Sequence, residues 1–344
     1  MNPLYIGTNI LPQLADFLKN RAFSKIAILL DENTLLHCYP QLKPYLPAHH
    51  LIQIKSGEAH KTLATCETIW QQMTDLNLDR WSVLVNLGGG VIGDMGGFCA
   101  AVFKRGLYFV QVPTTLLAQV DASVGGKTGI DFHGLKNHLG VYKEPQAVFI
   151  NPDFLKTLPQ RELKSGYAEI IKHWLIADAA TFEQQRFVGL FTENWEQLIR
   201  QSVTIKSEVV SADPLEGGYR KVLNFGHTVG HAVESYLLAK PGSEVLHGEA
   251  VAVGMLCEGW LSKEKGLLTE EELSKIEVFI FSVYDKVNLA FDDLKPIVQL
   301  ALQDKKNTNA TINCTLLQGI GKAVYDQPVT LPEIEASLRY YNLL

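Results

Sequence analysis

Histidine and carboxylate residues that could bind a metal ion gather in the second half of the chain. His227 and His231 stand four residues apart in the segment 224–234, so both would lie on one face of a helix, as in helical metal sites. His247 precedes another apolar segment, and Glu169 lies within an earlier one. A charged residue on an apolar helix face is costly unless it is paired or binds a ligand. One glutamate and two histidines from three helices are therefore predicted to form an open catalytic zinc site; spacing alone does not say which two histidines bind.

A glycine-rich segment in the first half suits a phosphate. Gly88-Gly-Gly-Val-Ile-Gly93 fits G-x-G-x-x-G between an expected strand and an expected helix. Glycines there let the backbone approach a pyrophosphate, and the following helix offers free N–H groups. This context favours a dinucleotide over a turn without a ligand. No acidic residue occurs between Asp94 and Asp121, so the ribose must be held elsewhere, and Asp31 and Asn33 are candidates.

A second glycine-rich segment resembles the end of the phosphate-binding loop of NTPases, G-x-x-x-x-G-K-[ST]. Val124-Gly-Gly-Lys-Thr128 matches the last residues of that motif, but the motif's first glycine would fall on Asp121. A carboxylate at that place would repel phosphates. The pattern therefore does not indicate an NTPase, although Lys127 on a glycine loop suits an anionic group.

The elements that must position these residues change character near residue 159. Apolar runs typical of buried parallel strands occur in the first part, at 25–30, 81–87, 107–112 and 146–150. Apolar residues at helical spacing follow, at 160–177, 195–212, 221–239, 247–265 and 270–283, before an expected hairpin within 311–325. The sequence predicts an α/β domain over residues 1–158 and a mostly helical domain over 159–344. We expect the active site in a cleft between them.

Composition excludes several classes of protein. The 344 residues include 31 Lys and Arg against 37 Asp and Glu, a net charge of −6, which argues against a nucleic-acid partner. No apolar run reaches the roughly 18 residues of a membrane span, and the first residues do not resemble a signal peptide. The 5 cysteines are scattered and never in C-x-x-C spacing, so we expect reduced thiols in a cytoplasmic protein.

Longer motifs resemble one family over essentially the whole chain. The most specific are 88–94, 113–127, Gly134-Leu-Lys-Asn137, 168–172 and 223–228, with Asp304-Lys-Lys306 near the end. They are similar to 3-dehydroquinate synthases, of the sugar-phosphate cyclase superfamily. The resemblance implies a Rossmann-like domain joined to a helical domain, with NAD and a divalent metal, zinc or cobalt, as cofactors. It also implies a lyase that converts 3-deoxy-D-arabino-heptulosonate 7-phosphate to 3-dehydroquinate and phosphate, by transient oxidation, phosphate elimination, re-reduction and aldol closure.

The resemblance also assigns residues to roles. The implied metal ligands are Glu169, His227 and His247, and His231 is placed beside the phosphate, contrary to what its spacing favours. The implied phosphate pocket further comprises Lys127, Asn137, Asn224, one of Lys305 and Lys306, and Arg105 from a second subunit. Lys206 and Arg220 match the groups that hold the substrate carboxylate, and Asp121 and Lys172 those near its hydroxyls. NAD contacts are implied for Asp31, Asn33, Glu58, Lys61, Gly88, Gly89, Gly90, Asp94, Thr114, Thr115, Lys127 and Lys136.

Three other functions compete with this interpretation. A sister cyclase acting on glucose 6-phosphate or sedoheptulose 7-phosphate would have no carboxylate for Lys206 and Arg220 to hold. An NAD- and metal-dependent polyol dehydrogenase would not need the phosphate-side residues, and a non-enzymatic relative would keep only a structural zinc. One departure from the family pattern is Pro214, which stands where an acid is common and affects the loop before Arg220. The resemblance also implies a homodimer.

Overall fold

The computed structural model describes residues 2–133, 135–190, 194–302 and 312–344. The chain forms two compact units. Unit 1 comprises Met1–Pro159 and Trp195–Val203, and unit 2 comprises Gln160–Asn194 and Thr204–Leu344. Among the described helices, none combines the length and apolar character required to span a membrane.

Unit 1 is built on a parallel sheet of six strands in the order β1-β8-β5-β4-β2-β3. The strands are β1 (Leu4–Ile6), β2 (Ile26–Asp31), β3 (His50–Ile54), β4 (Val83–Gly88), β5 (Tyr108–Pro113) and β8 (Val148–Ile150). The predicted α/β class and its parallel sheet are confirmed, and all four predicted strands are present. Sequence analysis missed β1 and β3, because one has three residues and the other is buried at only two positions.

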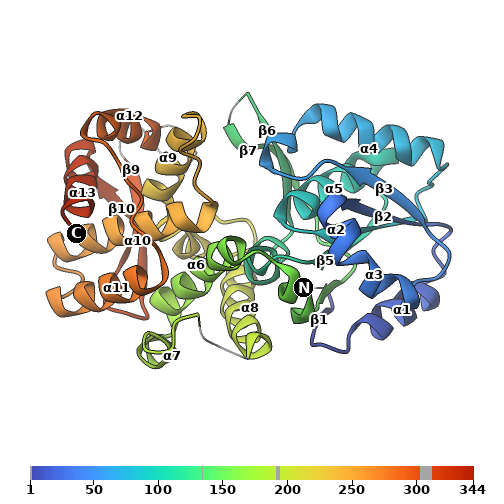
Figure 1. Cartoon of the computed structure of the whole chain (residues 1–344), viewed down its shortest axis with the longest axis horizontal. Helices are drawn as coiled ribbons and strands as arrows, with labels where there is room; N and C mark the ends of the chain where they lie inside the picture. Colours follow the sequence, from blue (N-terminus) through green and yellow to red (C-terminus); the bar gives the residue numbers. More distant parts are fainter. Residues whose placement is uncertain (1, 134, 191–193, 303–311) are drawn as a thin grey trace. The chain divides into compact units, whose positions relative to one another are not determined.

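Helices cover both faces of this sheet (Figure 1). They are α1 (Leu11–Asn20), α2 (Glu32–His37), α3 (Tyr39–Leu42), α4 (Leu63–Asp75) and α5 (Gly90–Val102). Alternate residues of β2 show the division: Ile28 packs in one cluster with Leu14 of α1, whereas Leu29 packs in the other with Ile69 of α4 and Met95 of α5. Each such side chain contributes roughly 1.5–3 kcal/mol when fully buried. The three layers therefore fix the carboxyl ends of the strands, where the glycine loop begins.

An antiparallel hairpin that was not predicted extends unit 1. It consists of β6 (Lys127–Phe132) and β7 (Leu135–Tyr142). Gly140 allows the two strands to approach closely, since a Cβ there would lie 2.4 Å from the carbonyl oxygen of Thr128. The hairpin carries three predicted site residues, Lys127, Lys136 and Asn137.

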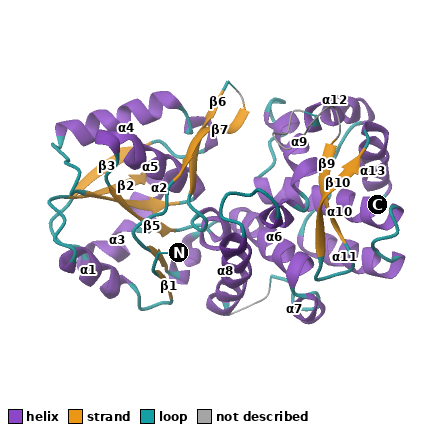
Figure 2. Cartoon of the chain, turned by 180° about the vertical axis from the view of Figure 1, so that it is seen from behind, coloured by secondary structure: helices purple, strands orange, loops and turns teal. Residues whose placement is uncertain are grey.

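Unit 2 is mostly helical, as predicted, with one small antiparallel sheet (Figure 2). Its elements are α6 (Gln160–Ala177), α7 (Ala179–Gln185), the end of α8 (Trp195–Ala212), α9 (His227–Leu238), α10 (His247–Glu264), α11 (Glu270–Val283), α12 (Phe291–Ala301), α13 (Leu331–Leu343), β9 (Ile312–Leu317) and β10 (Ala323–Val329). The central α10 is buried over Ala250–Cys257, as a helix that is apolar on all sides requires. The other short helical segments of the described residues are η1 (Lys43–Tyr45), η2 (Glu58–His60), η3 (Phe103–Arg105), η4 (Ala118–Ala122), η5 (Pro152–Thr157) and η6 (Tyr219–Asn224).

The predicted helix over 221–239 is wrong in one respect. The segment is divided into η6 and α9, which begins at His227. Gly226 separates them with a φ of +77°, a left-handed conformation that favours glycine. The break makes His227 the first residue of α9 and places His231 one turn further along the same helix.

Candidate active site

Close packing of three helices sets the position of the histidines in unit 2. A Cβ on Gly254 of α10 would lie 1.8 Å from the carbonyl oxygen of Gly226, and one on Gly248 would lie 2.0 Å from that of Ser165 in α6. Glu258 of α10 accepts two N–H groups at the start of α9, at 2.6 and 3.0 Å. Any larger residue at these glycines would separate the helices, so the histidine positions depend on them.

Two histidine rings converge on one glutamate oxygen. Nε2 of His227 lies 3.4 Å from Oε1 of Glu169, and Nε2 of His247 lies 3.3 Å from the same atom. Their other nitrogens are already engaged: Nδ1 of His227 faces the carbonyl oxygen of Phe225 at 3.0 Å, and Nδ1 of His247 faces Glu234 at 3.4 Å. Both Nε2 atoms are therefore the ones presented to a shared ligand.

Glu169 is a fully buried carboxylate that forms an ion pair with Lys172 one helical turn away. Burial raises the pKa of Glu169, but the charges of Lys172 and His227 outweigh it and hold the pKa well below its usual range. Neither carboxylate oxygen accepts a hydrogen bond of good geometry from the described residues. An ionised carboxylate with unused acceptor capacity beside two imidazoles fits a divalent cation such as Zn²⁺.

The two histidines differ in their protonation. Burial lowers the pKa of His227, and the neighbouring Lys172 lowers it further. Burial also lowers the pKa of His247, but the nearby carboxylates of Glu169 and Glu234 outweigh this and raise the pKa to about 10. His247 is therefore protonated at neutral pH without metal, and a metal ion must displace a proton from it.

His231 lies beside the same cluster. Its ring centroid is 5.0 Å from that of His227 and 5.8 Å from that of His247. The three histidines can place ligand nitrogens within 4.8 Å of one another. The structure thus brings together all four predicted residues, including the i, i+4 pair, and the choice of Glu169 over His231 as third ligand stays a prediction.

In unit 1, the glycine loop connects β4 to α5 and leaves the N-terminus of that helix open. Gly89 precedes α5 and supplies no side-chain cap. A Cβ on Gly89 would lie 3.0 Å from Thr115, and one on Gly88 would lie 2.4 Å from Ile92. The buried Thr114 donates its N–H to Gly88 at 3.0 Å. A backbone cradle with free N–H groups fits a pyrophosphate and hence a dinucleotide.

A buried lysine connects the predicted NAD and phosphate residues of unit 1. Nζ of Lys61 donates to Asp94 and to Oδ1 of Asn137, both at 2.6 Å. Burial lowers the pKa of Lys61, but Asp94 and Glu58 outweigh it, so the pKa is raised and the ammonium stays charged. Lys136 pairs with Glu58 at 3.6 Å nearby. These five predicted residues form one polar group.

The other predicted residues of unit 1 lie on separate elements. Asp31 ends β2 and accepts the N–H of Thr34 at 2.8 Å as the N-cap of α2, on which Asn33 is exposed. Asp121 is half-buried in η4, whereas Arg105 and Lys127 are exposed.

A turn in unit 2 holds Arg220, a predicted carboxylate-binding residue. The carboxylate of Asp213 accepts the N–H groups of Gly217, Gly218 and Arg220 at 3.0, 2.7 and 3.1 Å. These hydrogen bonds lower the pKa of Asp213, and the one from Gly218 has the largest effect. The carbonyl oxygen of Pro214 accepts Nη1 of Arg220 at 2.7 Å. The proline therefore contributes to the turn through its carbonyl group and does not disrupt it.

The remaining predicted residues of unit 2 are placed as follows. Lys206 and Arg220 are both buried, with 6% and 2% of their surfaces exposed. Asn224 donates to Glu216 at 3.0 Å. The predicted phosphate residues Lys305 and Lys306 lie outside the described residues.

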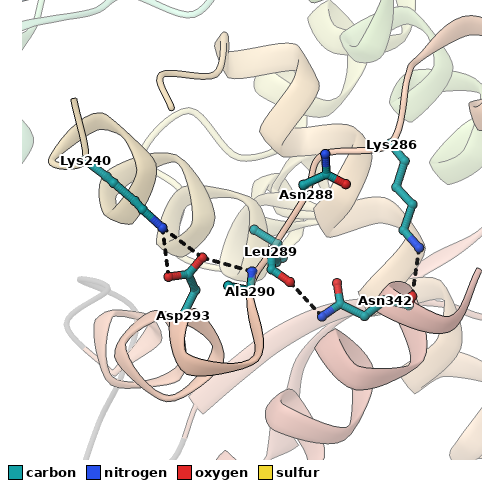
Figure 3. A pocket seen from close by; sticks show the side chains of 7 residues that line it. All are labelled: Lys240, Lys286, Asn288, Leu289, Ala290, Asp293 and Asn342. Atoms are coloured by element: carbon teal, nitrogen blue, oxygen red, sulfur yellow. Dashed lines mark hydrogen bonds and ion pairs between the residues drawn. The ribbon is translucent and has the colours of Figure 1, made fainter. Parts of the chain in front are cut away.

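A separate hollow of about 430 Å³ lies in unit 2 near the start of α12 (Figure 3). Its charged groups are paired within the chain: Lys240 contacts Asp293 at 3.1 Å, and Lys286 donates to the carbonyl oxygen of Asn342 at 2.7 Å. It contains none of the predicted site residues.

Sequence analysis missed Glu234 and Glu258. Glu234 stands three residues after His231, which places the two side chains on one helix face. That spacing was a usable signal for Glu234. Nothing in the sequence connects Glu258 with the start of α9, because that contact exists only after α9 and α10 pack.

Solved structures define the class. The fold is that of the sugar-phosphate cyclases. A 2-deoxy-scyllo-inosose synthase complexed with carbaglucose-6-phosphate, NAD⁺ and Co²⁺ superimposes with a TM-score of 0.87 at 25% identity, over 98% of this chain and 96% of that one. The 2-epi-5-epi-valiolone synthase of Streptomyces hygroscopicus, with NAD⁺ and Zn²⁺ bound, superimposes with a TM-score of 0.87 at 30% identity, over 99% of this chain and 96% of that one.

Sequence comparisons define the family within that class. The family models for the N-terminal and C-terminal parts of 3-dehydroquinate synthase match residues 51–165 and 166–307. The 3-dehydroquinate synthase of Parabacteroides distasonis is 41% identical, over 96% of this chain and 95% of its own length. The 3-dehydroquinate synthase of Sulfurovum sp. is 42% identical, over 87% of this chain and 85% of its own length. The chain belongs to the 3-dehydroquinate synthase family, as the motifs indicated.

Proposed function

We propose that this chain converts 3-deoxy-D-arabino-heptulosonate 7-phosphate to 3-dehydroquinate and phosphate. The observation that carries the proposal is the pair of buried cations, Lys206 and Arg220, in a chain of this family that also has a candidate metal site and a glycine loop suited to a nucleotide. A guanidinium group and an ammonium group suit a substrate carboxylate, because Arg can pair with both carboxylate oxygens and Lys adds a second positive charge. The sister cyclases' substrates lack a carboxylate.

The cofactors of the proposal are NAD and one divalent metal, zinc or cobalt. Bound to this chain, NAD would accept and return a hydride, and the metal would polarise the oxygens at the carbon undergoing oxidation. Glu169, His227 and His247 would hold the metal, and the loop beginning at Gly88, together with Lys61, would hold NAD.

The chain's own residues would orient a doubly anionic substrate. In the proposal Arg220 and Lys206 bind the carboxylate, while Asn224, His231 and the hairpin residues bind the phosphate. Lys172, buried and paired with Glu169, would donate hydrogen bonds to the substrate hydroxyls. Fixed donors of this kind contribute to catalysis because they need no rearrangement as charge develops.

Phosphate release from three substrates tests the proposal. We expect release from the heptulosonate phosphate, with a kcat/KM at least a hundredfold above that for sedoheptulose 7-phosphate or glucose 6-phosphate. The solved neighbours make a sister cyclase the second candidate. A higher kcat/KM with either of those two sugar phosphates would favour it and would contradict our proposal.

A homodimer is a further part of the proposal. The exposed residues Lys104 and Arg105 both adopt left-handed backbone conformations, with φ of 51° and 68°. Such conformations are strained in non-glycine residues and are often retained for function. The Nζ of Lys104 is held by the carbonyl oxygen of Leu78 at 2.7 Å. This geometry would support Arg105 in reaching the phosphate site of a second copy.

Mixed dimers test this assignment. Arg105→Ala and His247→Ala should each be inactive alone, but subunits exchanged between them should regain about a quarter of the wild-type activity per subunit. The regained activity requires Arg105 of one subunit to complete the other's site. If exchange demonstrably occurs and no activity returns, Arg105 acts within its own subunit or has no role.

The location in the cell is a last part of the proposal. The five free, buried cysteines support a reducing compartment, and we propose the cytoplasm.

A further inference from the structure

His247 is held between two carboxylates from different helices. It is the first residue of α10, with Nε2 3.3 Å from Glu169 of α6 and Nδ1 3.4 Å from Glu234 of α9. The side chain of Glu234 is 5% exposed, that of Glu169 is fully buried, and that of His247 is 24% exposed. The imidazole ring therefore has an anionic partner on each side.

The other predicted histidine ligand has a weaker partner. Nδ1 of His227 faces a neutral acceptor, the carbonyl oxygen of Phe225, at 3.0 Å. Hydrogen bonds to an ionised acceptor are roughly twice as strong as those between neutral groups. The two histidines therefore differ in how firmly the ring orientation is fixed and in how far the acceptor raises the basicity of the ring.

We propose that Glu234 is a positioning residue for the metal site, acting through His247. Its carboxylate holds the proton of His247 on Nδ1, which leaves the lone pair of Nε2 for the metal ion. Its charge also makes this imidazole the stronger electron donor of the pair. A carboxylate behind a ligating histidine fixes the tautomer and ring orientation and raises ligand basicity, and its loss typically weakens metal binding 10–100-fold. The inference rests on the proposed function, because it assumes that the cluster binds a metal.

The position of Glu234 fits this role better than a purely structural one. Glu258, the other buried glutamate at the α9–α10 contact, accepts backbone N–H groups and so fixes the helix itself. Asp293, near the far end of α9, accepts from the hydroxyl of Tyr236 at 2.7 Å and from Lys240. Glu234 instead faces the ring nitrogen of a predicted ligand.

Metal affinity provides the test. In Glu234→Gln the amide keeps the shape but loses the charge, and we expect the Kd for Zn²⁺, measured by competition with a chromophoric chelator, to rise 10–100-fold. The visible spectrum of the Co²⁺ form should also shift, because the donor strength of one ligand changes. The matched control is Asp293→Asn, the same carboxylate-to-amide change at an equally buried residue that also contacts α9. It should leave both the Kd and the spectrum unchanged.

A cycle with His247→Ala shows whether Glu234 acts through that ring. In the His247→Ala background, Glu234→Gln should add less than a twofold further loss of Zn²⁺ affinity. An equal loss in both backgrounds, or an unchanged Kd and Co²⁺ spectrum in the single variant, would overturn the proposal. If Glu234→Gln does not fold, Glu234→Asp is the alternative variant, because it keeps the charge but moves the carboxylate away from Nδ1 of His247. A Zn²⁺ Kd identical to that of the wild type would then also contradict the proposed role of Glu234.

The failure of the proposed function has a different signature. If the wild-type protein does not bind one Zn²⁺ ion per chain, the metal site itself is refuted. Wild-type protein that binds Zn²⁺ while Glu234→Gln binds it equally well would refute only the role of Glu234.

Discussion

Glu169→Gln should both destabilise the metal-free protein and abolish tight metal binding. Glu169 is fully buried and pairs with Lys172, whose side chain is 2% exposed. Removing one partner of a buried ion pair leaves the other charge uncompensated, which costs about 3–5 kcal/mol. His247 loses its partner at Nε2 as well, so we expect a loss at the upper end of that range.

Urea denaturation of chelator-treated protein measures this loss of unfolding free energy. A second variant separates charge from metal binding: Glu169→Gln combined with Lys172→Met removes both charges and should recover most of the lost stability, because a buried pair replaced by uncharged groups is often neutral. Neither variant should bind Zn²⁺ tightly. Metal-free Glu169→Gln as stable as wild type would refute the reasoning, since the ion pair would then contribute nothing.

Four other substitutions give distinct outcomes. His247→Ala should lose its metal during purification, whereas His231→Ala should retain it by elemental analysis but lose turnover; loss of metal from both variants would favour the three-histidine set. Arg220→Ala should weaken binding of the heptulosonate phosphate about ten- to hundredfold, as the loss of roughly 1.5–3 kcal/mol from a charged hydrogen bond implies, and should affect a decarboxylated analogue far less; equal losses would argue against the carboxylate role. Gly254→Ala should reduce both thermal stability and Zn²⁺ affinity, because its Cβ would lie 1.8 Å from the carbonyl oxygen of Gly226, and unchanged Zn²⁺ affinity would show that helix spacing does not set the site.

Strong periodicity made the helical elements predictable. The segments 195–212 and 270–283 match α8 and α11 at both ends, because their apolar faces repeat without interruption. The division at Gly226 was missed, since the apolar residues on either side continue at helical spacing. Hairpin β6–β7 was missed because its strands contain glycines and exposed polar residues, and its pairing depends on contacts made after the chain turns.

The candidate metal site was predictable in its residue types but not in its geometry. The spacing of His227 and His231 indicated a helix face, and the apolar surroundings of Glu169 indicated a buried charge. Which nitrogen each ring presents depends on Phe225 and Glu234, and these contacts come from the packing of α9 and α10. The bridge from Lys61 to Asp94 and Asn137 likewise joins residues up to 76 positions apart, so no local pattern could predict it.

Simultaneous measurement of phosphate and NADH tests the central claim most directly. Purified protein with Zn²⁺ and a catalytic amount of NAD would receive 3-deoxy-D-arabino-heptulosonate 7-phosphate, and both products would be followed in one sample. We predict many phosphates released per NAD, with 3-dehydroquinate formed in equal amount and no accumulation of NADH. NADH rising in proportion to substrate consumed, with the phosphate still attached to the product, would identify a dehydrogenase and contradict the proposed function.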